Sequence, residues 1–237
     1  MTRHIPNLLT LANLFCGCCA LLYTFYWHPD VAAFFTACCF LFDYLDGMAA
    51  RALKVCSPIG KELDSLADVV SFGVVPGAML YQLLSHNSPA MVPGFQATLI
   101  DFAALPAFVL SAFSALRLAK FNLDTRQTEH FLGLSTPACT VFVLGLVLTA
   151  HHDLFGLRET LENQWLVYGL VALLSALLVS EIPMFGMKIK GCGLRQYTVH
   201  LVFLALFAVF VFFLKELAFS AIIVAYVLGS AVFRDKV

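Results

Sequence analysis

Apolar runs of helical length recur along the whole of this 237-residue chain. A helix needs about 20 mostly apolar residues to cross the hydrocarbon core of a bilayer. Short polar or turn-forming stretches separate eight segments that meet this rule, namely 7–26, 31–52, 58–84, 95–121, 135–153, 165–187, 197–214 and 217–234. We therefore expect an all-α polytopic membrane protein with about eight transmembrane helices.

Composition agrees with this reading. Hydrophobic residues make up 61% of the chain and charged residues only 12%, whereas soluble domains carry about 25% charged residues. No polar connection is long enough to fold alone, so residues 1–237 are expected to form a single membrane-embedded domain. The net charge of −1 gives no basis for nucleic-acid binding, which requires a basic face.

Six of the eight cysteines lie inside the apolar runs. They do not show the paired spacing of a zinc site, and adjacent cysteines within one helix cannot easily hold a single ion. We interpret them as small packing residues in a reducing environment. They are Cys16, Cys18, Cys19, Cys38, Cys39 and Cys139.

The basic residues predict the orientation in the membrane. Eight spans place both termini on one side, and all of the 14 Lys and Arg residues except Arg158 and Lys215 fall on that side. Because cytoplasmic loops carry the excess of Lys and Arg, both termini are predicted to be cytoplasmic. This would be an integral protein of the cytoplasmic membrane.

Four aspartates interrupt the second and third apolar segments. Asp43 and Asp46 are three residues apart, and Asp64 and Asp68 are four apart, so each pair shares one helical face. The short connection between the segments reverses the chain, so the two acidic faces can meet near the cytoplasmic interface. Small residues and one arginine lie on the same faces at helical spacing, namely Gly47, Ala50, Arg51 and Gly60.

Such a cluster needs positive charge. A charged side chain costs about 2.5–3.5 kcal/mol at the centre of a bilayer, and less toward the interface. Hard divalent cations such as Mg²⁺ or Mn²⁺ prefer carboxylate oxygens, whereas Zn²⁺ prefers His and Cys, which the pattern lacks. The alternative is a set of surface acids paired with nearby Lys and Arg, but that does not explain the glycines at four-residue steps.

The same faces suggest a phosphate ligand. Gly47 and Ala50 let a ligand approach the backbone, and the planar guanidinium of Arg51 suits phosphate. Two metal ions about 3.5–4 Å apart can stabilise the attacking and leaving oxygens of a phosphoryl displacement. The residues alone therefore favour a metal-bound phosphate ester.

The full pattern resembles the signature of the CDP-alcohol phosphatidyltransferase family. It reads Asp43-x-x-Asp46-Gly47-x-x-Ala50-Arg51, followed by Gly60, Asp64 and Asp68. Five further stretches resemble the membrane phosphatidylserine synthases of bacteria and archaea, which are one branch of this family. These stretches are "IPNLLTLANLFCG", "DSLADVVSFGVVPG", "RLAKFN", "GLSTPA" and "IPMFGMKIK".

The resemblance implies a reaction. The phosphatidyl group of CDP-diacylglycerol would pass to the hydroxyl of L-serine, giving phosphatidylserine and CMP. Two Mg²⁺ or Mn²⁺ ions per active site are implied, with Asp43 and Asp64 contacting both and Asp46 binding the first. Asp68 would bind the second ion and accept the proton of the attacking hydroxyl. The active site would face the cytoplasm, in a homodimer.

The resemblance also implies substrate contacts. Those for CDP-diacylglycerol are Pro6, Asn7, Thr10, Asn13, Gly47, Ala50, Arg51, Ser57 and Gly60. Those for serine are Arg117, Lys120, Asn122 and Lys188. The basic members of this second set have an alternative role as anchors that contact lipid headgroups at the cytoplasmic surface.

Two alternative functions stay open at this point. The aspartate signature is shared by enzymes that use other alcohols, such as glycerol 3-phosphate. A cation channel or transporter is the alternative from another class, because acids inside a membrane often mark ion paths. Clustering of the acids at one interface favours the enzyme.

Other polar residues are harder to place. Glu181 falls within the segment 165–187, where it could pair with Lys188 or Arg117 or border the alcohol site. His151 and His152 are adjacent at the opposite interface, and we interpret them as interfacial residues rather than metal ligands.

Overall fold

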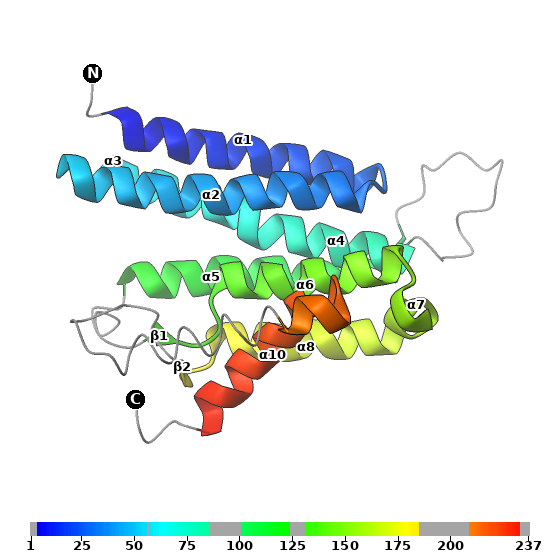
Figure 1. Ribbon diagram of the computed structural model, residues 1–237. Coiled ribbons are helices and arrows are strands. Elements are labelled where there is room, and N and C mark those ends of the chain that lie inside the picture. The colour runs from blue at the N-terminus through cyan, green and yellow to red at the C-terminus, as the bar shows by residue number, and fades with distance from the viewer. Residues whose placement is uncertain (1–3, 56, 86–100, 124–130, 185–208, 233–237) are drawn as a thin grey trace.

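The computed structural model describes residues 4–55, 57–85, 101–123, 131–184 and 209–232, and nearly all of them are helical (Figure 1). The helices are α1 (Ile5–Phe25), α2 (Pro29–Leu53), α3 (Pro58–Asp68), α4 (Val75–Ser85), α5 (Val109–Leu123), α6 (Thr136–His151), α7 (Arg158–Leu161), α8 (Gln164–Val179) and α10 (Leu217–Val232). Strands β1 (Phe131–Leu132) and β2 (Pro183–Met184) form an antiparallel pair. A π-helical segment (Val69–Val74) joins α3 to α4, and 3-10 turns lie at Leu105–Phe108 and Leu154–Gly156.

Among the described residues, three helical stretches are long and apolar enough to cross a membrane: Ile5–Phe25, Pro29–Leu53 and Pro58–Ser85. The apolar helices α6, α8 and α10 are shorter. Large apolar side chains on the outer faces of α1 and α2 are exposed, among them Phe15 at 68% and Phe34 at 64%. Extensive apolar surface of this kind suits lipid rather than water. The chain is therefore an integral membrane protein, as its composition predicts.

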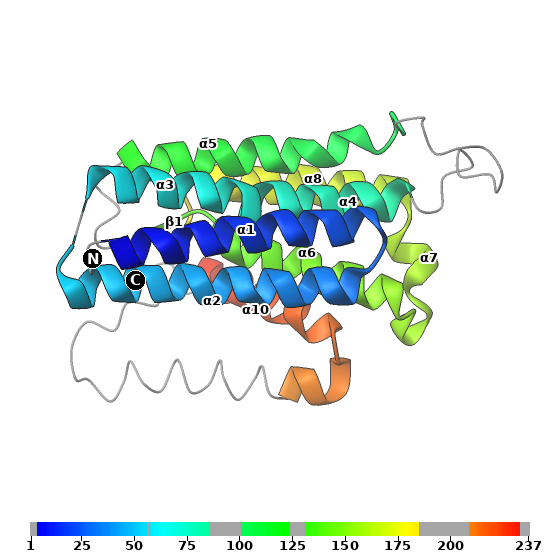
Figure 2. The ribbon, with the colours of Figure 1, turned by 90° about the horizontal axis from the view of Figure 1, so that it is seen from above.

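Tight connections hold the first helices side by side. Helix α1 packs against α2 on one side and against α3 and α4 on the other (Figure 2). Helix α2 ends at Leu53, and its C-cap Lys54 adopts a left-handed conformation. Helix α3 then begins with Ser57, whose side chain accepts a hydrogen bond from the Gly60 amide over 3.0 Å, and with Pro58 in the first turn. This short reversal keeps the end of α2 beside the start of α3.

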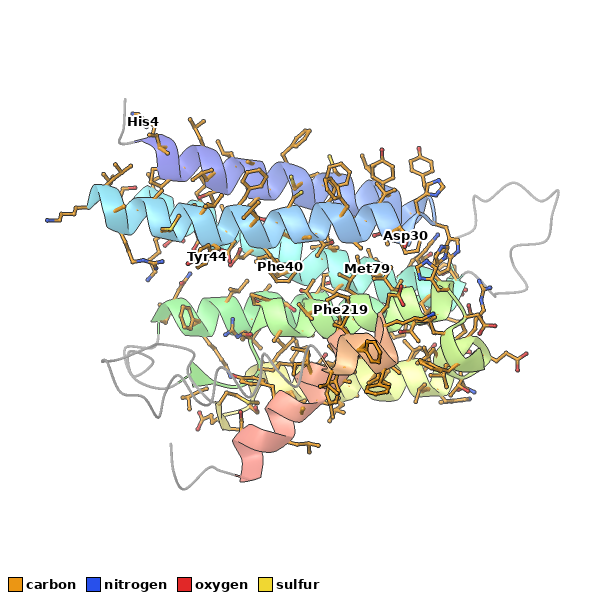
Figure 3. The ribbon with its side chains drawn as sticks, in the orientation of Figure 1. His4, Asp30, Phe40, Tyr44, Met79 and Phe219 are labelled. Carbon is orange, nitrogen blue, oxygen red and sulfur yellow. The ribbon has the colours of Figure 1, made fainter. Side chains whose placement is uncertain are left out.

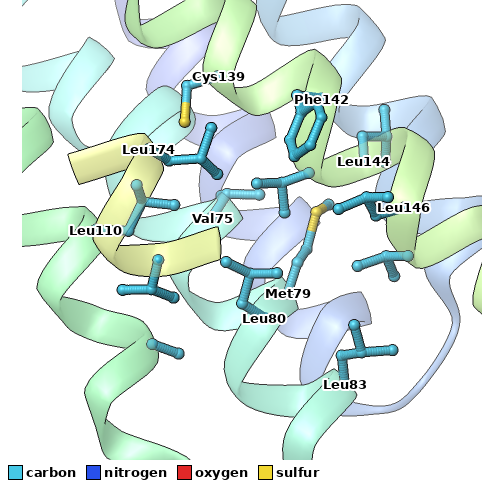
Figure 4. Packing of buried hydrophobic residues seen from close by; sticks show 14 of the residues in the cluster. Val75, Met79, Leu80, Leu83, Leu110, Cys139, Phe142, Leu144, Leu146 and Leu174 are labelled. Carbon is cyan, nitrogen blue, oxygen red and sulfur yellow. The ribbon is translucent and has the colours of Figure 1, made fainter. Parts of the chain in front are cut away.

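The main hydrophobic core lies between α4, α6 and α8 (Figure 4). Val75, Met79 and Leu80 of α4 are fully buried there against Val143 of α6 and Leu174 of α8. Helix α10 runs obliquely to the others in Figure 1 and packs against α6. The Ser220 hydroxyl donates to the Phe142 carbonyl over 2.8 Å at this contact.

Two predicted boundaries were wrong. In the described part of the expected span 95–121, residues 101–104 are not helical, and a 3-10 turn at Leu105–Phe108 with Pro106 in its first turn leads into α5. The expected span 165–187 ends at Val179, and the following backbone pairs as strand β2 with β1. Pro183 explains the difference, because proline lacks an N–H and biases the preceding residue away from helix. Glu181, expected inside that span, lies exposed beyond the helix end. The six cysteines of the apolar runs are free thiols, while Cys56 and Cys192 lie outside the described residues.

The π-helical segment Val69–Val74 was not predicted. It begins directly after Asp68, the last residue of α3, and continues into α4. A Cβ on Gly17 of α1 would lie only 3.2 Å from Cα of Ser71, so the glycine permits close approach of the two backbones. Ser111 of α5 donates to the Gly73 carbonyl over 2.8 Å on another side of the same segment. Contacts with α1 and α5 therefore hold the π-helical segment in place.

Candidate active site

Three carboxylates converge between α2 and α3. Asp43 projects from α2, and Asp64 and Asp68 project from α3. One oxygen from each lies within 4.8 Å of the others, and all three residues are partly buried. The prediction that the two acidic helix faces meet is confirmed for these residues, which we call the aspartate cluster.

Asp46 is the neighbour of the cluster on α2, and its buried side chain is held from α1. Thr10 Oγ1 donates to Asp46 Oδ2 over 2.6 Å, and the Pro6 carbonyl, 3.1 Å from the same hydroxyl oxygen, is a second acceptor for its single proton. Asp46 is close enough to interact electrostatically with the carboxyl groups of Asp43, Asp64 and Asp68. The sequence predicted one set of four acids; the structure gathers three closely and fixes the fourth beside them.

Asn13 contacts the cluster from the same face of α1. Its Nδ2 donates to Asp68 Oδ1 over 3.3 Å, and its side chain is fully buried. Thr10 and Asn13 were expected to contact the nucleotide, and that contact stays a prediction; in the structure both side chains bond to aspartates. The physical reason is that a polar side chain inside a membrane helix needs a hydrogen-bond partner.

The cluster fits a hard divalent cation. Within the described part of the chain, no Lys, Arg or His nitrogen comes within 4.0 Å of Asp43, Asp64 or Asp68. Asp64 Oδ1 is buried without a hydrogen-bond partner there. Unpaired buried carboxylates are strongly unfavourable, and an all-oxygen donor set suits Mg²⁺ or Mn²⁺. The residues present therefore agree with a metal site.

The last turns of α2 provide the space and charge expected beside such a site. Arg51 is exposed, and its guanidinium lies over Gly47, where an added Cβ would be 3.6 Å from Nη1. Ala50 is partly buried on the same helix. A side chain at position 47 would occupy the space beside the guanidinium.

Gly60 marks the place where the first turns of α1 and α3 meet. A Cβ there would lie 2.9 Å from Ser57 Oγ and 3.1 Å from Asn7 Oδ1. Pro6 is buried next to Asn7. The predicted residues Asn7, Ser57 and Gly60 are thus neighbours in space, although Ser57 also caps α3.

Arg117 is the buried cation on α5, with 7% of its surface exposed. Its Nη1 donates to Thr136 Oγ1 over 3.4 Å, and the guanidinium stacks on Phe121 at 5.6 Å from the ring centroid. Its Nε is buried without a hydrogen-bond partner among the described residues, and the charge of Asp68 acts on it. Arg117 therefore has an unused donor near the aspartate cluster.

The other residues predicted to contact serine differ in their surroundings. Lys120 is exposed. Asn122 Nδ2 donates to Ser65 Oγ over 2.7 Å, and the Asn122 carbonyl accepts from Lys61 Nζ over 3.3 Å, so Asn122 ties α5 to α3. Lys188 lies outside the described residues.

Sequence reasoning missed Ser65 and Thr136. Ser65 follows Asp64 directly, and Thr136 is the first residue of α6, where Ser135 accepts from the Ala138 amide over 3.3 Å. The only available signal was that both fall within stretches that carry the family resemblance, "DSLADVVSFGVVPG" and "GLSTPA".

The fold and site define a class of protein: a helical integral membrane protein with an aspartate cluster suited to divalent cations. Comparison with known families makes this specific. Residues 3–182 match the model of the CDP-alcohol phosphatidyltransferases, so the chain belongs to this family and is an enzyme. The aspartate signature and its predicted family are confirmed, and the channel or transporter alternative is set aside.

Curated relatives share one printed name, CDP-diacylglycerol–serine O-phosphatidyltransferase. The chain is 33% identical to that of Helicobacter pylori (strain J99) over 205 residues, covering 85% of this chain and 80% of the relative. It is 32% identical to that of Mycobacterium leprae over 229 residues, covering 94% and 71%. It is 34% identical to that of Bacillus subtilis over 135 residues, covering 57% and 70%.

Proposed function

We propose that this enzyme transfers the phosphatidyl group of CDP-diacylglycerol to the hydroxyl of L-serine, producing phosphatidylserine and CMP. The observation that carries the proposal is the convergence of Asp43, Asp64 and Asp68 in a member of this transferase family. Serine as the alcohol is supported by the names of relatives that are 32–34% identical.

The four aspartates would hold two Mg²⁺ or Mn²⁺ ions. When bound, such ions neutralise charge on the pyrophosphate and on the departing phosphate oxygen. The chain itself contributes the rigid placement of these carboxylates: Thr10 holds Asp46, and Asn13 holds Asp68. Fixed ligands need little reorganisation during the reaction, which is how preorganised sites lower a barrier.

Asp68 is the proposed general base. Asn13 orients one of its oxygens, which leaves the other to accept the proton of the serine hydroxyl. The serine oxygen then forms a bond to the phosphorus of the phosphatidyl group. The bond from that phosphorus to the bridging oxygen breaks, and CMP leaves with the electron pair.

The nucleotide end of CDP-diacylglycerol is proposed to lie near the ends of α2 and the starts of α1 and α3. Arg51 offers a guanidinium for phosphate, and Gly47 leaves space beside it. Pro6, Asn7, Ala50, Ser57 and Gly60 line the same region.

Arg117 is proposed to bind the serine carboxylate through its unused Nε. Lys120, Asn122 and Lys188 remain further candidates. Glycerol 3-phosphate is the second alcohol to consider, and its phosphate would require more positive charge than one buried guanidinium.

The membrane arrangement is part of the proposal. We place both termini and the aspartate cluster on the cytoplasmic side, with eight spans in one domain covering residues 1–237. Helix α7, which carries Arg158, lies at the end of the bundle opposite to the start of α3, in agreement with the sorting of basic residues (Figure 1). A homodimer is also expected.

The alcohol is tested with purified protein in detergent, CDP-diacylglycerol, Mn²⁺ and radiolabelled alcohols supplied side by side. We expect a lipid product from serine that co-migrates with phosphatidylserine on thin-layer chromatography, and little product from glycerol 3-phosphate or inositol phosphate. A larger yield from glycerol 3-phosphate than from serine would assign the enzyme to a different branch. It would leave the role of the aspartate cluster intact.

A further inference from the structure

A second group of possible metal ligands lies far from the aspartate cluster. It consists of Asp30, His151 and His152, and one ligand atom from each lies within 4.8 Å of the others. Figure 3 shows Asp30 at one end of α2 and Tyr44, the neighbour of Asp43, toward the other. Asp30 and Asp43 are 13 positions apart on this helix, which corresponds to about 20 Å. The two groups are therefore separate sites.

The two imidazoles lie close together at the end of helix α6. His151 is the last residue of α6, and His152 is its C-cap, with φ −84° and ψ 1°. Their ring centroids are 5.1 Å apart. These histidines were expected to be interfacial residues rather than metal ligands, and their convergence with Asp30 could not be predicted because it depends on how α2 packs beside the end of α6.

Both Nε2 atoms face the same carboxylate. His152 Nε2 is 3.3 Å from Asp30 Oδ1, and His151 Nε2 is 3.8 Å from Asp30 Oδ2. Ligand bonds of about 2.0–2.2 Å in a tetrahedral zinc site place neighbouring ligand atoms about 3.3–3.6 Å apart. The two nitrogen–oxygen distances, 3.3 Å and 3.8 Å, are close to these values, and one ligand atom from each of the three residues lies within 4.8 Å of the others.

Glu216 supports this arrangement from the turn before α10. Its Oε1 lies 3.5 Å from His152 Nδ1, and its Oε2 is buried without a hydrogen-bond partner among the described residues. A carboxylate at Nδ1 directs the proton of a neutral imidazole to that nitrogen. The Nε2 lone pair of His152 then faces an oxygen of Asp30, and these two acceptors repel unless a metal ion or a proton lies between them.

We propose that Asp30, His151 and His152 bind a first-row transition-metal ion such as Zn²⁺, with Glu216 as the positioning residue for His152. Imidazole ligands favour such ions over Mg²⁺. Three protein ligands leave a fourth position for water. Asp30 has 60% of its side chain exposed, so the site is open to ions from solution. The ion would join the start of α2 to the end of α6, and Glu216 in the turn before α10 would orient one of its ligands.

The test uses the full chain in detergent, stripped of metal and then held in excess Mg²⁺ so that the aspartate cluster is occupied. Zn²⁺ or Co²⁺ is titrated, bound metal is measured after gel filtration, and the Co²⁺ absorption spectrum is recorded. We expect one tightly bound ion per chain, with the visible bands of tetrahedral Co²⁺ and without thiolate charge-transfer absorption. Zn²⁺ should also raise the Tm of the wild-type protein.

Variants identify the ligands. Asp30→Ala and His152→Ala should each weaken binding at least about tenfold and abolish the rise in Tm, and Glu216→Gln should weaken binding by about 10–100-fold. His28→Ala is the matched control, since His28 is exposed at the same end of α2 and should leave binding unchanged. Equal affinity in wild type, Asp30→Ala and His152→Ala would overturn the proposal. So would the absence of any bound Zn²⁺ or Co²⁺ in the presence of Mg²⁺.

Discussion

Thr10 of α1 donates a hydrogen bond to Asp46 of α2 over 2.6 Å, although the two residues are 36 positions apart in the sequence. Both side chains are buried. The Pro6 carbonyl one turn earlier lies 3.1 Å from the Thr10 hydroxyl and is a second acceptor for its proton, so α1 itself helps to fix the position of the hydroxyl. The orientation of one carboxylate beside the aspartate cluster is therefore set by a helix that carries no acid.

Replacing Thr10 by valine tests this link, because valine keeps the shape and removes the donor. We expect metal affinity to fall by about 10–100-fold, the usual effect of losing a group that orients a metal ligand. Thr10→Ser retains the hydroxyl and should stay close to wild type. Mn²⁺ dependence of CMP release provides the measurement, and equal Mn²⁺ requirements for the valine and serine variants would remove Thr10 from the site.

Asp43 and Asp64 are each expected to be indispensable, since each is proposed to contact both ions. Changing either to asparagine keeps the size of the side chain and should reduce CMP release to background and weaken Mn²⁺ binding. Glu62→Gln is the matched control, because Glu62 is an exposed acid on the same helix as Asp64. Substantial turnover by Asp64→Asn would contradict the two-metal arrangement.

Asp68→Asn separates proton transfer from binding. The substitution removes the proposed proton acceptor, which typically contributes about 10²–10⁴-fold to the rate. We expect turnover to fall by a factor in this range while the affinity for CDP-diacylglycerol changes much less. Binding of the nucleotide lipid can be followed separately by equilibrium methods, and near-normal turnover would move the general base to another residue.

Arg117→Lys probes the serine site. Lysine keeps the charge but cannot reproduce the planar set of donors, so the KM for serine should rise at least about tenfold while the KM for CDP-diacylglycerol stays nearly constant. Lys120→Ala changes an exposed cation on the same helix and is the control. An equal rise of both KM values in Arg117→Lys would indicate a general structural role instead.

Gly145→Ala tests the packing of α10 on α6. An added Cβ would lie 2.8 Å from the Ser220 backbone nitrogen and 2.9 Å from Phe219 Cβ, so backbone has to shift. Overpacking of this kind costs about 1–3 kcal/mol, and the Tm in detergent should fall. Gly169→Ala places a Cβ where nothing lies within 4 Å and should leave the Tm unchanged or raise it slightly.

The sequence predicted those features that depend on local pattern. The apolar runs gave the membrane helices α1 and α2, and the spacing of Asp43, Asp64 and Asp68 gave three converging carboxylates. The partners of Thr10 and Asn13 could not be predicted, because they depend on the rotation of α1 against its neighbours.

Contacts across the helical bundle also could not be predicted from the sequence. The early end of α8 was signalled by Pro183, but the pairing of β2 with β1 joins segments about 50 positions apart. Such long-range pairing produces no periodic pattern in the sequence. The meeting of Asp30 with His151 and His152 has the same origin, since it needs the full fold to place α2 beside the end of α6.

The π-helical segment Val69–Val74 would have to be included if this site were moved into another protein. A π-helical turn adds a residue relative to an α-helix, and one residue corresponds to a rotation of about 100°. Asp64 and Asp68 precede the turn, while Val75 and Met79 of the core follow it. If these four residues were copied into a straight α-helix at the same sequence spacing, the side chains after the turn would be rotated relative to the aspartates. The carboxylates and the core residues could then not both keep the directions that they have here. The extra residue is therefore part of the transferable unit, along with the aspartates themselves.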